Sequence, residues 1–318
     1  GCSTISGWFG GSDNSTPPAE LKPIAQPISI QQLWETRVGA GADEQFIRLI
    51  PALIDGRVYA ASHDGMVVAL DALSGQRRWE IATQLPISGG VGVSDDGLVL
   101  VGTRKGEVIA LRQDNGQEVW RARVSSEVLA PPRAASGIVV VRTIDGKFTG
   151  FDSRSGEQRW VYTHAMPALS LRGNAPPLMT RELMIAGLDS GKLLVLSLAK
   201  GLPLTEKTIA APRGRTEIER LIDIDSEPKA FGDTLYLAAY HGNVAAINMR
   251  DGNLVWSRDL SSHAGLDVDA RQVYVSDDTD AVLALDRAAG GTFWKQPEMT
   301  GRRLSAPAAT TDHVVVGD

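Results

Sequence analysis

Residues 71–79 read DALSGQRRW, and nearly the same phrase returns four times along the chain. In every copy glycine stands at the fifth position and tryptophan at the ninth. The other copies are RQDNGQEVW (112–120), DSRSGEQRW (152–160), NMRDGNLVW (248–256) and DRAAGGTFW (286–294). A tryptophan that recurs at one position of a repeated phrase indicates a repeated structural unit.

The glycines of these phrases give the repeat length. Gly75, Gly116, Gly156, Gly201, Gly252 and Gly290 are separated by 41, 40, 45, 51 and 38 residues, and periods of this size are typical of β-propellers. Each repeat holds a segment rich in small residues, two apolar runs joined by a tight polar turn, and the tryptophan-bearing phrase. Four short strands joined in this way form an antiparallel sheet that must stack on neighbouring copies to bury both faces. The sequence therefore predicts an all-β fold, a β-propeller of four-stranded antiparallel blades.

The number of blades follows from the number of repeats. Six complete repeats run from about residue 51 to 294, and APAATTDHVVVGD (306–318) begins a seventh. Trp34, in QLWETRV, has the outer-strand position but no preceding strands of its own, so its segment is expected to complete the last blade. We predict eight blades, with seven as the alternative, in a domain that spans residues 31–318 and lacks the C-terminal part of the ring.

The repeated tryptophans have a structural interpretation. A large ring on the outermost strand of a blade fills the wedge that opens between diverging blades, which is the role expected for Trp34, Trp79, Trp120, Trp160, Trp256 and Trp294. One blade departs from the pattern, because SLAKGLPLT (197–205) has Thr205 at the tryptophan position. In DALSG, Asp71 is expected to accept backbone hydrogen bonds and Gly75 to take the left-handed conformation.

Composition and motifs argue against several functions. A net charge of −6 and a pI near 5.5, with basic residues dispersed, are not typical of a nucleic-acid binder. The apolar runs are strand-sized, far short of the ~20 residues of a membrane-spanning helix. No G-x-S-x-G, P-loop or HExxH motif is present, and a single cysteine excludes a disulfide within the chain. Asp277, Asp278 and Asp280 read as a solvated turn in preference to a cation site, so we predict no catalytic residue, metal or cofactor.

The first residues suggest an attachment to a membrane. Gly1-Cys2-Ser3 resembles the end of a lipobox, in which the cysteine after the cleavage site carries lipid; a cysteine without this role is the alternative. The following residues are rich in Gly, Ser and Pro without periodicity, which is typical of a linker. Residues 1–30 are therefore predicted to be a lipidation site, Cys2, and a flexible tether. Ser3 resembles the sorting pattern of lipoproteins of the Gram-negative outer membrane.

Two connections between blades are extended, residues 161–175 and 206–227, and strand alternation places both on one face of the ring. Long loops on a rigid scaffold often carry binding residues. The first contains Leu169, Leu171 and Arg172, and the second ends with Asp223 and Asp225. Apolar groups mixed with charges suit a protein interface, so we predict that these five residues bind a partner. The alternatives are that the leucines cap a blade and that Asp223 makes a turn.

The repeat resembles the pyrroloquinoline-quinone-type propeller repeat, with its Asp, Gly and Trp spacing. Among such proteins the chain is most similar to the BamB family, lipoprotein subunits of the BAM machinery that assembles outer-membrane β-barrels, over nearly its whole length. This resemblance implies a monomeric, non-enzymatic scaffold of the outer membrane, facing the periplasm. It also implies that the Leu-Ser-Leu-Arg segment at 169–172 and the Asp-x-Asp segment at 223–225 contact the POTRA domains of BamA.

Two other functions stay open at this point. A quinone-dependent dehydrogenase shares the repeat, but enzymes of that branch are longer and commonly carry a vicinal disulfide, for which this chain lacks the cysteines. A carbohydrate-binding propeller would need exposed aromatic residues in its funnel, whereas the predicted inner strands hold mostly Ala, Pro and Gly.

Overall fold

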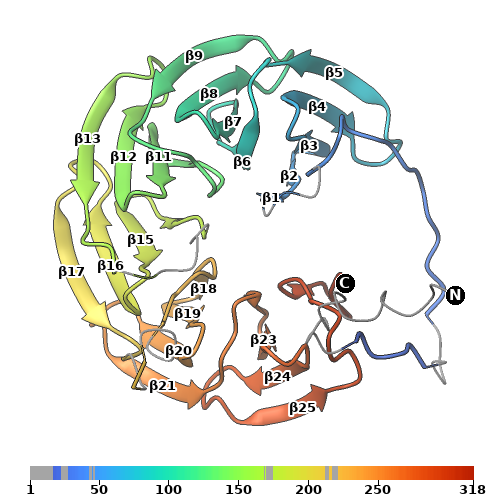
Figure 1. Cartoon of the computed structure of the whole chain (residues 1–318), viewed down its shortest axis with the longest axis vertical. Helices are drawn as coiled ribbons and strands as arrows, with labels where there is room; N and C mark the ends of the chain where they lie inside the picture. The colour runs from blue at the N-terminus through green and yellow to red at the C-terminus, as the bar shows by residue number, and fades with distance from the viewer. Residues whose placement is uncertain are drawn as a thin grey trace, which may run out of the picture.

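The computed structural model describes residues 17–22, 28–42, 45, 47–167, 169, 175–211, 215–216 and 221–318. Within them the chain is all β, and six four-stranded antiparallel sheets stand around a common centre as the blades of a propeller (Figure 1). The predicted fold class is confirmed. No helix in these residues is long and apolar enough to cross a membrane.

The blades are numbered along the chain, and each runs from an inner to an outer strand. Blade 1 comprises β2 (Ala52–Ile54), β3 (Arg57–Ala61), β4 (Met66–Asp71) and β5 (Arg77–Ala82). Blade 2 comprises β6 (Ile87–Val93), β7 (Leu98–Thr103), β8 (Glu107–Arg112) and β9 (Glu118–Arg123). Blade 3 comprises β10 (Arg133–Ala135), β11 (Ile138–Thr143), β12 (Lys147–Asp152) and β13 (Gln158–Thr163). Blade 4 comprises β14 (Leu178–Met179), β15 (Leu183–Gly187), β16 (Lys192–Ser197) and β17 (Pro203–Thr208). Blade 5 comprises β18 (Lys229–Phe231), β19 (Thr234–Ala238), β20 (Asn243–Asn248) and β21 (Leu254–Asp259). Blade 6 comprises β22 (Gly265–Val268), β23 (Gln272–Ser276), β24 (Val282–Asp286) and β25 (Thr292–Gln296).

Three further strands lie outside this scheme. The short β1 (Arg48–Leu49) pairs in parallel with β6 and adds a fifth strand on the inner edge of blade 2. After blade 6, β26 (Ala308–Ala309) and β27 (Val314–Val315) form an antiparallel pair, which is the start of the predicted seventh blade. The total of eight or seven blades stays a prediction.

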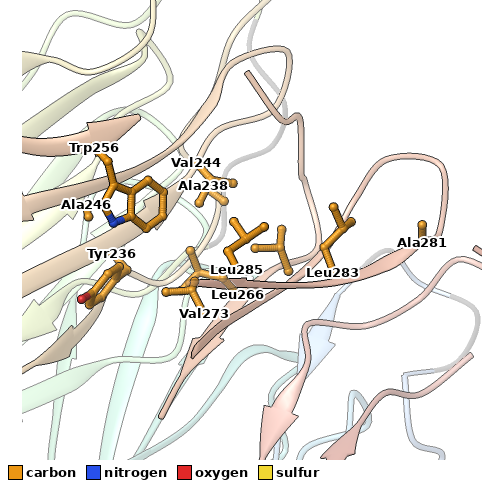
Figure 2. Packing of buried hydrophobic residues seen from close by; sticks show 11 residues of the cluster. Tyr236, Ala238, Val244, Ala246, Trp256, Leu266, Val273, Ala281, Leu283 and Leu285 are labelled. Atoms are coloured by element: carbon orange, nitrogen blue, oxygen red, sulfur yellow. The ribbon is translucent and has the colours of Figure 1, made fainter. Parts of the chain in front are cut away.

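The hydrophobic core lies between blades. Figure 2 shows one such layer, in which Tyr236, Val244 and Trp256 of blade 5 face Val273 and Leu285 of blade 6. The middle strands read as near-continuous apolar runs because both faces of each blade are covered by neighbours.

Five of the six repeated tryptophans reach the turn of the blade that follows them. The Trp79 indole N–H donates to the Gln113 carbonyl at 2.9 Å, and its ring lies on Gly116, where an added Cβ would come within 2.8 Å of it. The same donor and acceptor relation recurs along the ring: Trp34 to Ala72, Trp120 to Ser153, Trp160 to Leu198 and Trp256 to Arg287. The phrase quoted first therefore supplies both halves of a contact, a ring for the next blade and a glycine turn for the preceding one.

Two places lack this contact. Blade 4 has Thr205 in place of tryptophan, and a Cβ added to Gly252 in blade 5 would meet nothing within 4 Å among the described residues. There the Lys207 amine of blade 4 donates to the Gly252 carbonyl instead. The second place is blade 6, whose Trp294 is 40 % exposed, whereas Trp160 of blade 3 is 8 % exposed.

Two N-terminal segments lie in the sector of the ring between blade 6 and blade 1 (Figure 1). Trp34 packs on the Gly75 turn of blade 1, although residues 28–38 form no strand. Ala19, which falls within the predicted tether, donates its N–H to the Thr300 carbonyl and accepts from Arg302. These contacts hold residues 17–22 against the segment that follows blade 6; the remainder of the tether lies outside the described residues except for 28–30.

Candidate functional site

The longest connections between blades share one face of the ring with the turns between the second and third strands of each blade. They are residues 164–177, between blades 3 and 4, and residues 209–228, between blades 4 and 5. We call them the first loop and the second loop, and the side that carries them the loop face. The glycine turns that receive the tryptophans lie on the opposite face. The repeated contacts between blades and the long, non-repeated loops are therefore on different faces of the ring.

The structure places some of the predicted partner-binding residues. Leu169 lies in the first loop with its side chain 48 % exposed. Asp223 and Asp225 lie at the end of the second loop, where they are 0 % and 9 % exposed. Leu171 and Arg172, like Cys2, lie outside the described residues. The Asp223 carboxyl group is thus inside the protein and is not accessible from its surface.

A buried arginine organises the interior below the two loops. Arg142, on β11 of blade 3, is 5 % exposed and donates from Nη2 to Asp189 at 2.5 Å. Its Nη1 donates to the carbonyls of Ala175 and Gly187, at 3.3 and 3.2 Å. Since Asp189 lies in the β15–β16 turn and Ala175 lies near the end of the first loop, one guanidinium joins blade 3 to two segments of the loop face.

Asp225 completes the contacts of Ala175. The Ala175 N–H donates to the Asp225 carboxylate at 3.0 Å, so both backbone polar groups of this residue are bonded to charged side chains. Such bonds are stronger than those between neutral groups. Ala175, near the end of the first loop, is therefore held from two sides, by Arg142 of blade 3 and by Asp225 near the end of the second loop.

Asp223 is the unusual member of this cluster. Its backbone pairs with Tyr240, but neither carboxyl oxygen has a hydrogen-bond partner among the described residues. Burial, together with the negative charges of Asp189 and Asp225, raises the pKa of Asp223 to about 8, and the nearby Arg142 charge opposes this rise. At neutral pH the Asp223 side chain is therefore mostly protonated and uncharged.

The start of the first loop is anchored beside the same arginine. His164 donates its backbone N–H to the Gly146 carbonyl at 3.0 Å, and its ring packs against Phe148, with 6.0 Å between ring centroids. The Arg142 guanidinium lies 5.7 Å from the Phe148 centroid, so Phe148 contacts both. Burial lowers the pKa of His164, with the Arg142 charge acting in the same direction.

Sequence reasoning did not find Arg142 and Asp189. Arg142 lies near the end of the apolar run IVVVRT (138–143), and a charged residue in a buried strand is rare unless it is paired. That anomaly was the available signal. Its partner could not be identified, because Asp189 belongs to a polar turn similar to those of the other blades.

An ion pair joins the innermost strand of blade 3 to the segment just before the innermost strand of blade 5. Arg133, at the start of β10 in blade 3, donates to Glu227 beside blade 5 at 2.6 Å, and Lys229 pairs with the other Glu227 oxygen at 2.9 Å. Both cations lower the pKa of Glu227, against the effect of burial. In the part of the chain that the structure describes, no group of three or more His, Cys, Asp or Glu residues is placed to hold a metal ion.

These features define a class of protein: a tryptophan-joined β-propeller with two long loops anchored on one face. The chain matches the family described as "Outer membrane protein assembly factor BamB" over residues 30–88 and 63–296. Proteins of that name from Xanthomonas campestris pv. campestris and Pseudomonas aeruginosa are each 40 % identical to it. The matches cover 100 % and 99 % of this chain and 82 % of each relative. The chain belongs to the BamB family.

A solved structure agrees with this assignment. The crystal structure of BamB from Moraxella catarrhalis superimposes with a TM-score of 0.80 at 30 % sequence identity, covering 85 % of this chain and 82 % of that one.

Proposed function

We propose that the protein is a non-enzymatic scaffold in the assembly of outer-membrane proteins, and that its loop face binds the periplasmic POTRA domains of BamA. The relatives are named as outer membrane protein assembly factors, which supports the process. The main observation in favour of this binding site is the pair of long loops on one face. Near their ends the two loops are joined inside the protein, where Ala175 of the first loop bonds to Arg142 and to Asp225 of the second. Such anchoring reduces the ordering cost of binding, because the loop bases are already fixed.

Within this proposal the loop residues have different roles. Leu169, Leu171 and Arg172 supply the contact, because arginine is enriched at protein interfaces and apolar side chains contribute surface removed from water on binding. Asp225 and Asp223 do not contact the partner directly but support the loops from the interior: Asp225 binds the Ala175 backbone, and Asp223 is buried. The six tryptophans contribute to stability and take no part in binding.

Arg172→Glu is expected to weaken binding to purified POTRA domains by about tenfold or more, because it reverses a charge at the interface. Leu171→Ala is expected to weaken it by a comparable factor through lost apolar contact. Titration calorimetry measures both. Arg78→Glu is the matched control, since Arg78 pairs with Asp71 in the turn on the opposite face. Wild-type affinity in both loop variants would refute the site.

We also propose that Cys2 carries lipid and that residues 1–30 tether the propeller, residues 31–318, to the periplasmic side of the outer membrane of a Gram-negative cell. Expressed with its leader, Cys2→Ser is expected to move the protein from the membrane fraction to the soluble periplasmic fraction and to abolish labelling by palmitate. Retention of Cys2→Ser in the membrane fraction of cells without other BAM subunits would contradict this anchor.

A further inference from the structure

The interface between blades 4 and 5 lacks the tryptophan ring that joins other neighbouring blades. Thr205 stands at the tryptophan position of blade 4, exposed to solvent, and a Cβ added to Gly252 would meet nothing within 4 Å among the described residues. In the turns that receive a tryptophan, a Cβ added to the glycine would come within 2.5–2.8 Å of the ring: Gly75, Gly116, Gly156, Gly201 and Gly290. We call the open space between Thr205 and the Gly252 turn the notch.

The strand next to Thr205 shows the same difference. In the other five blades the residue paired with the tryptophan on the neighbouring strand is alanine or glycine: Ala69, Ala110, Gly150, Ala246 and Ala284. Thr205 pairs instead with Val195. The four alanines are 0 % exposed, whereas Val195 is only partly buried. An apolar side chain that a ring would cover is therefore left partly exposed beside the notch.

The turn that borders the notch has the form of the turns that bind an indole. Gly252 has a φ of 70° and donates its N–H to the Asn248 carbonyl at 2.8 Å. In each of the five tryptophan contacts the indole N–H donates to the carbonyl of the second residue of the repeated phrase. In blade 5 that residue is Met249, and no described side chain donates to its carbonyl. The turn thus offers both parts of the contact, a glycine surface and a carbonyl acceptor.

The lysine that crosses the notch is compatible with a ring. Lys207 of β17 donates to the Gly252 carbonyl. Arg258, two residues after Trp256, donates in the same way to the Gly290 carbonyl at 2.9 Å. There the Trp256 ring lies on the glycine as well. A cation and an indole therefore share one turn between blades 5 and 6, and the same arrangement is available between blades 4 and 5.

Apolar side chains lie beside the notch on the outer rim, where β17 and β21 are neighbours (Figure 1). Leu204 of blade 4 is 58 % exposed, and Leu254 and Val255, which follow the receiving turn, are 52 % and 49 % exposed. In blade 3 the positions of the last two hold the polar Gln158 and Arg159. Exposed apolar groups that gather at one place are typical of protein interaction sites.

We infer that the notch binds a tryptophan side chain of another protein, with the ring on Gly252, the indole N–H on the Met249 carbonyl, and the apolar side chains of the rim against the flanking residues of that partner. The chain itself identifies the occupant, because five turns of the same form each hold an indole. Tryptophan is also enriched among the residues that dominate the binding energy of protein interfaces. The notch lies on the face opposite to the loop face, so it is a second binding surface, and the inference does not depend on the proposed function.

The fit of an indole is tested first within the chain. Thr205→Trp supplies the ring from blade 4, and Val195→Ala/Thr205→Trp also supplies the small residue that lies opposite the tryptophan in other blades. The thermal unfolding midpoint of this double variant is expected to lie several degrees above that of Val195→Ala, its matched control. An equal or lower midpoint would show that the notch does not accept an indole and would overturn the inference.

Binding of a separate tryptophan is tested by titrating the ¹⁵N-labelled protein with N-acetyl-tryptophanamide. Amide shifts are expected at residues 205 and 249–255, with a dissociation constant on the order of 1 mM for a single side chain. The turns at Gly116 and Gly201 are internal controls, because they already hold rings, and N-acetyl-leucinamide should bind more weakly. The double variant should lose the site. Absent shifts, equal shifts at all turns, or shifts unchanged in the double variant would each contradict the inference.

The two proposals fail in different ways. If the wild type binds the tryptophan probe but no POTRA domain, the proposed function fails and the notch stands. Affinity for POTRA domains should be unchanged in the double variant, since the notch lies on the other face; its loss would show that the notch is not a second surface. If the double variant does not fold, the titration of the wild type with its internal controls decides.

Discussion

Asp223→Asn is expected to stabilise the protein at neutral pH, raising the free energy of unfolding by about 2–4 kcal/mol at pH 7. In the folded chain burial raises the pKa of Asp223 to about 8 from an ordinary value of 3.8. At pH 7 the folded state must therefore hold a proton that the unfolded state releases. Asparagine has a similar shape without this cost, and urea denaturation followed by circular dichroism measures the difference.

The stability difference between Asp223→Asn and the wild type is expected to increase as the pH rises. A raised pKa in the folded state contributes stability that is complete below pH 3.8 and is lost as the pH rises to about 8. The advantage of Asp223→Asn over the wild type should therefore grow by about 1 kcal/mol per pH unit between pH 5 and pH 8 and stay constant above that. Asp95→Asn, which removes an exposed carboxyl group, should show no such trend. An advantage independent of pH would mean that Asp223 is ionised in the folded protein.

Gly201→Ala is expected to destabilise the protein by about 3 kcal/mol or more, through a clash with a tryptophan. Gly201 has a φ of 64° and receives the Trp160 ring, which would lie 2.5 Å from an added Cβ. Gly252→Ala is the matched control. It has a φ of 70° at the same position of its turn, but its Cβ would meet nothing within 4 Å among the described residues. Only the left-handed strain, about 1–2 kcal/mol, should remain.

The comparison separates two reasons for a glycine. Equal losses in both variants would show that backbone conformation alone requires glycine in these turns, and that the tryptophan rings adapt. A larger loss for Gly201→Ala would show that the ring contact matters in addition. Thermal unfolding of the two variants beside the wild type is sufficient.

The fold could be predicted because the repeat is encoded locally. The Gly-to-Trp spacing of DALSGQRRW occurs in five of the six blades, and the strands between the phrases are neighbours in sequence and in space. The exception, Thr205, is visible when the repeats are compared, and at Gly252 of the next blade an added Cβ would meet no described residue within 4 Å.

The interior of the site could not be predicted in the same way. Arg142, Ala175 and Asp225 come from three different connections or strands, and their meeting depends on how blades 3, 4 and 5 are arranged. The mixture of apolar and charged residues in two long loops, together with the family resemblance, predicted that Asp223 binds a partner. The apolar neighbours Ile222 and Ile224 are buried with it, 4 % and 0 % exposed, so the whole segment 222–224 lies inside the protein.

The tryptophan contact has a direction. Trp120 of blade 2 donates to the Ser153 carbonyl of blade 3, while the blade 2 turn receives Trp79 of blade 1. Each blade thus has a donor side and a receiver side, as subunits do in a head-to-tail oligomer. A polymer of separate blades with such sides could close on itself or grow without limit. Here the peptide chain fixes the order of the blades. The tryptophan contacts join neighbouring blades through side chains and do not depend on the peptide link between them. A circular permutant opened in the short connection between blades 1 and 2 is therefore expected to keep every one of these contacts.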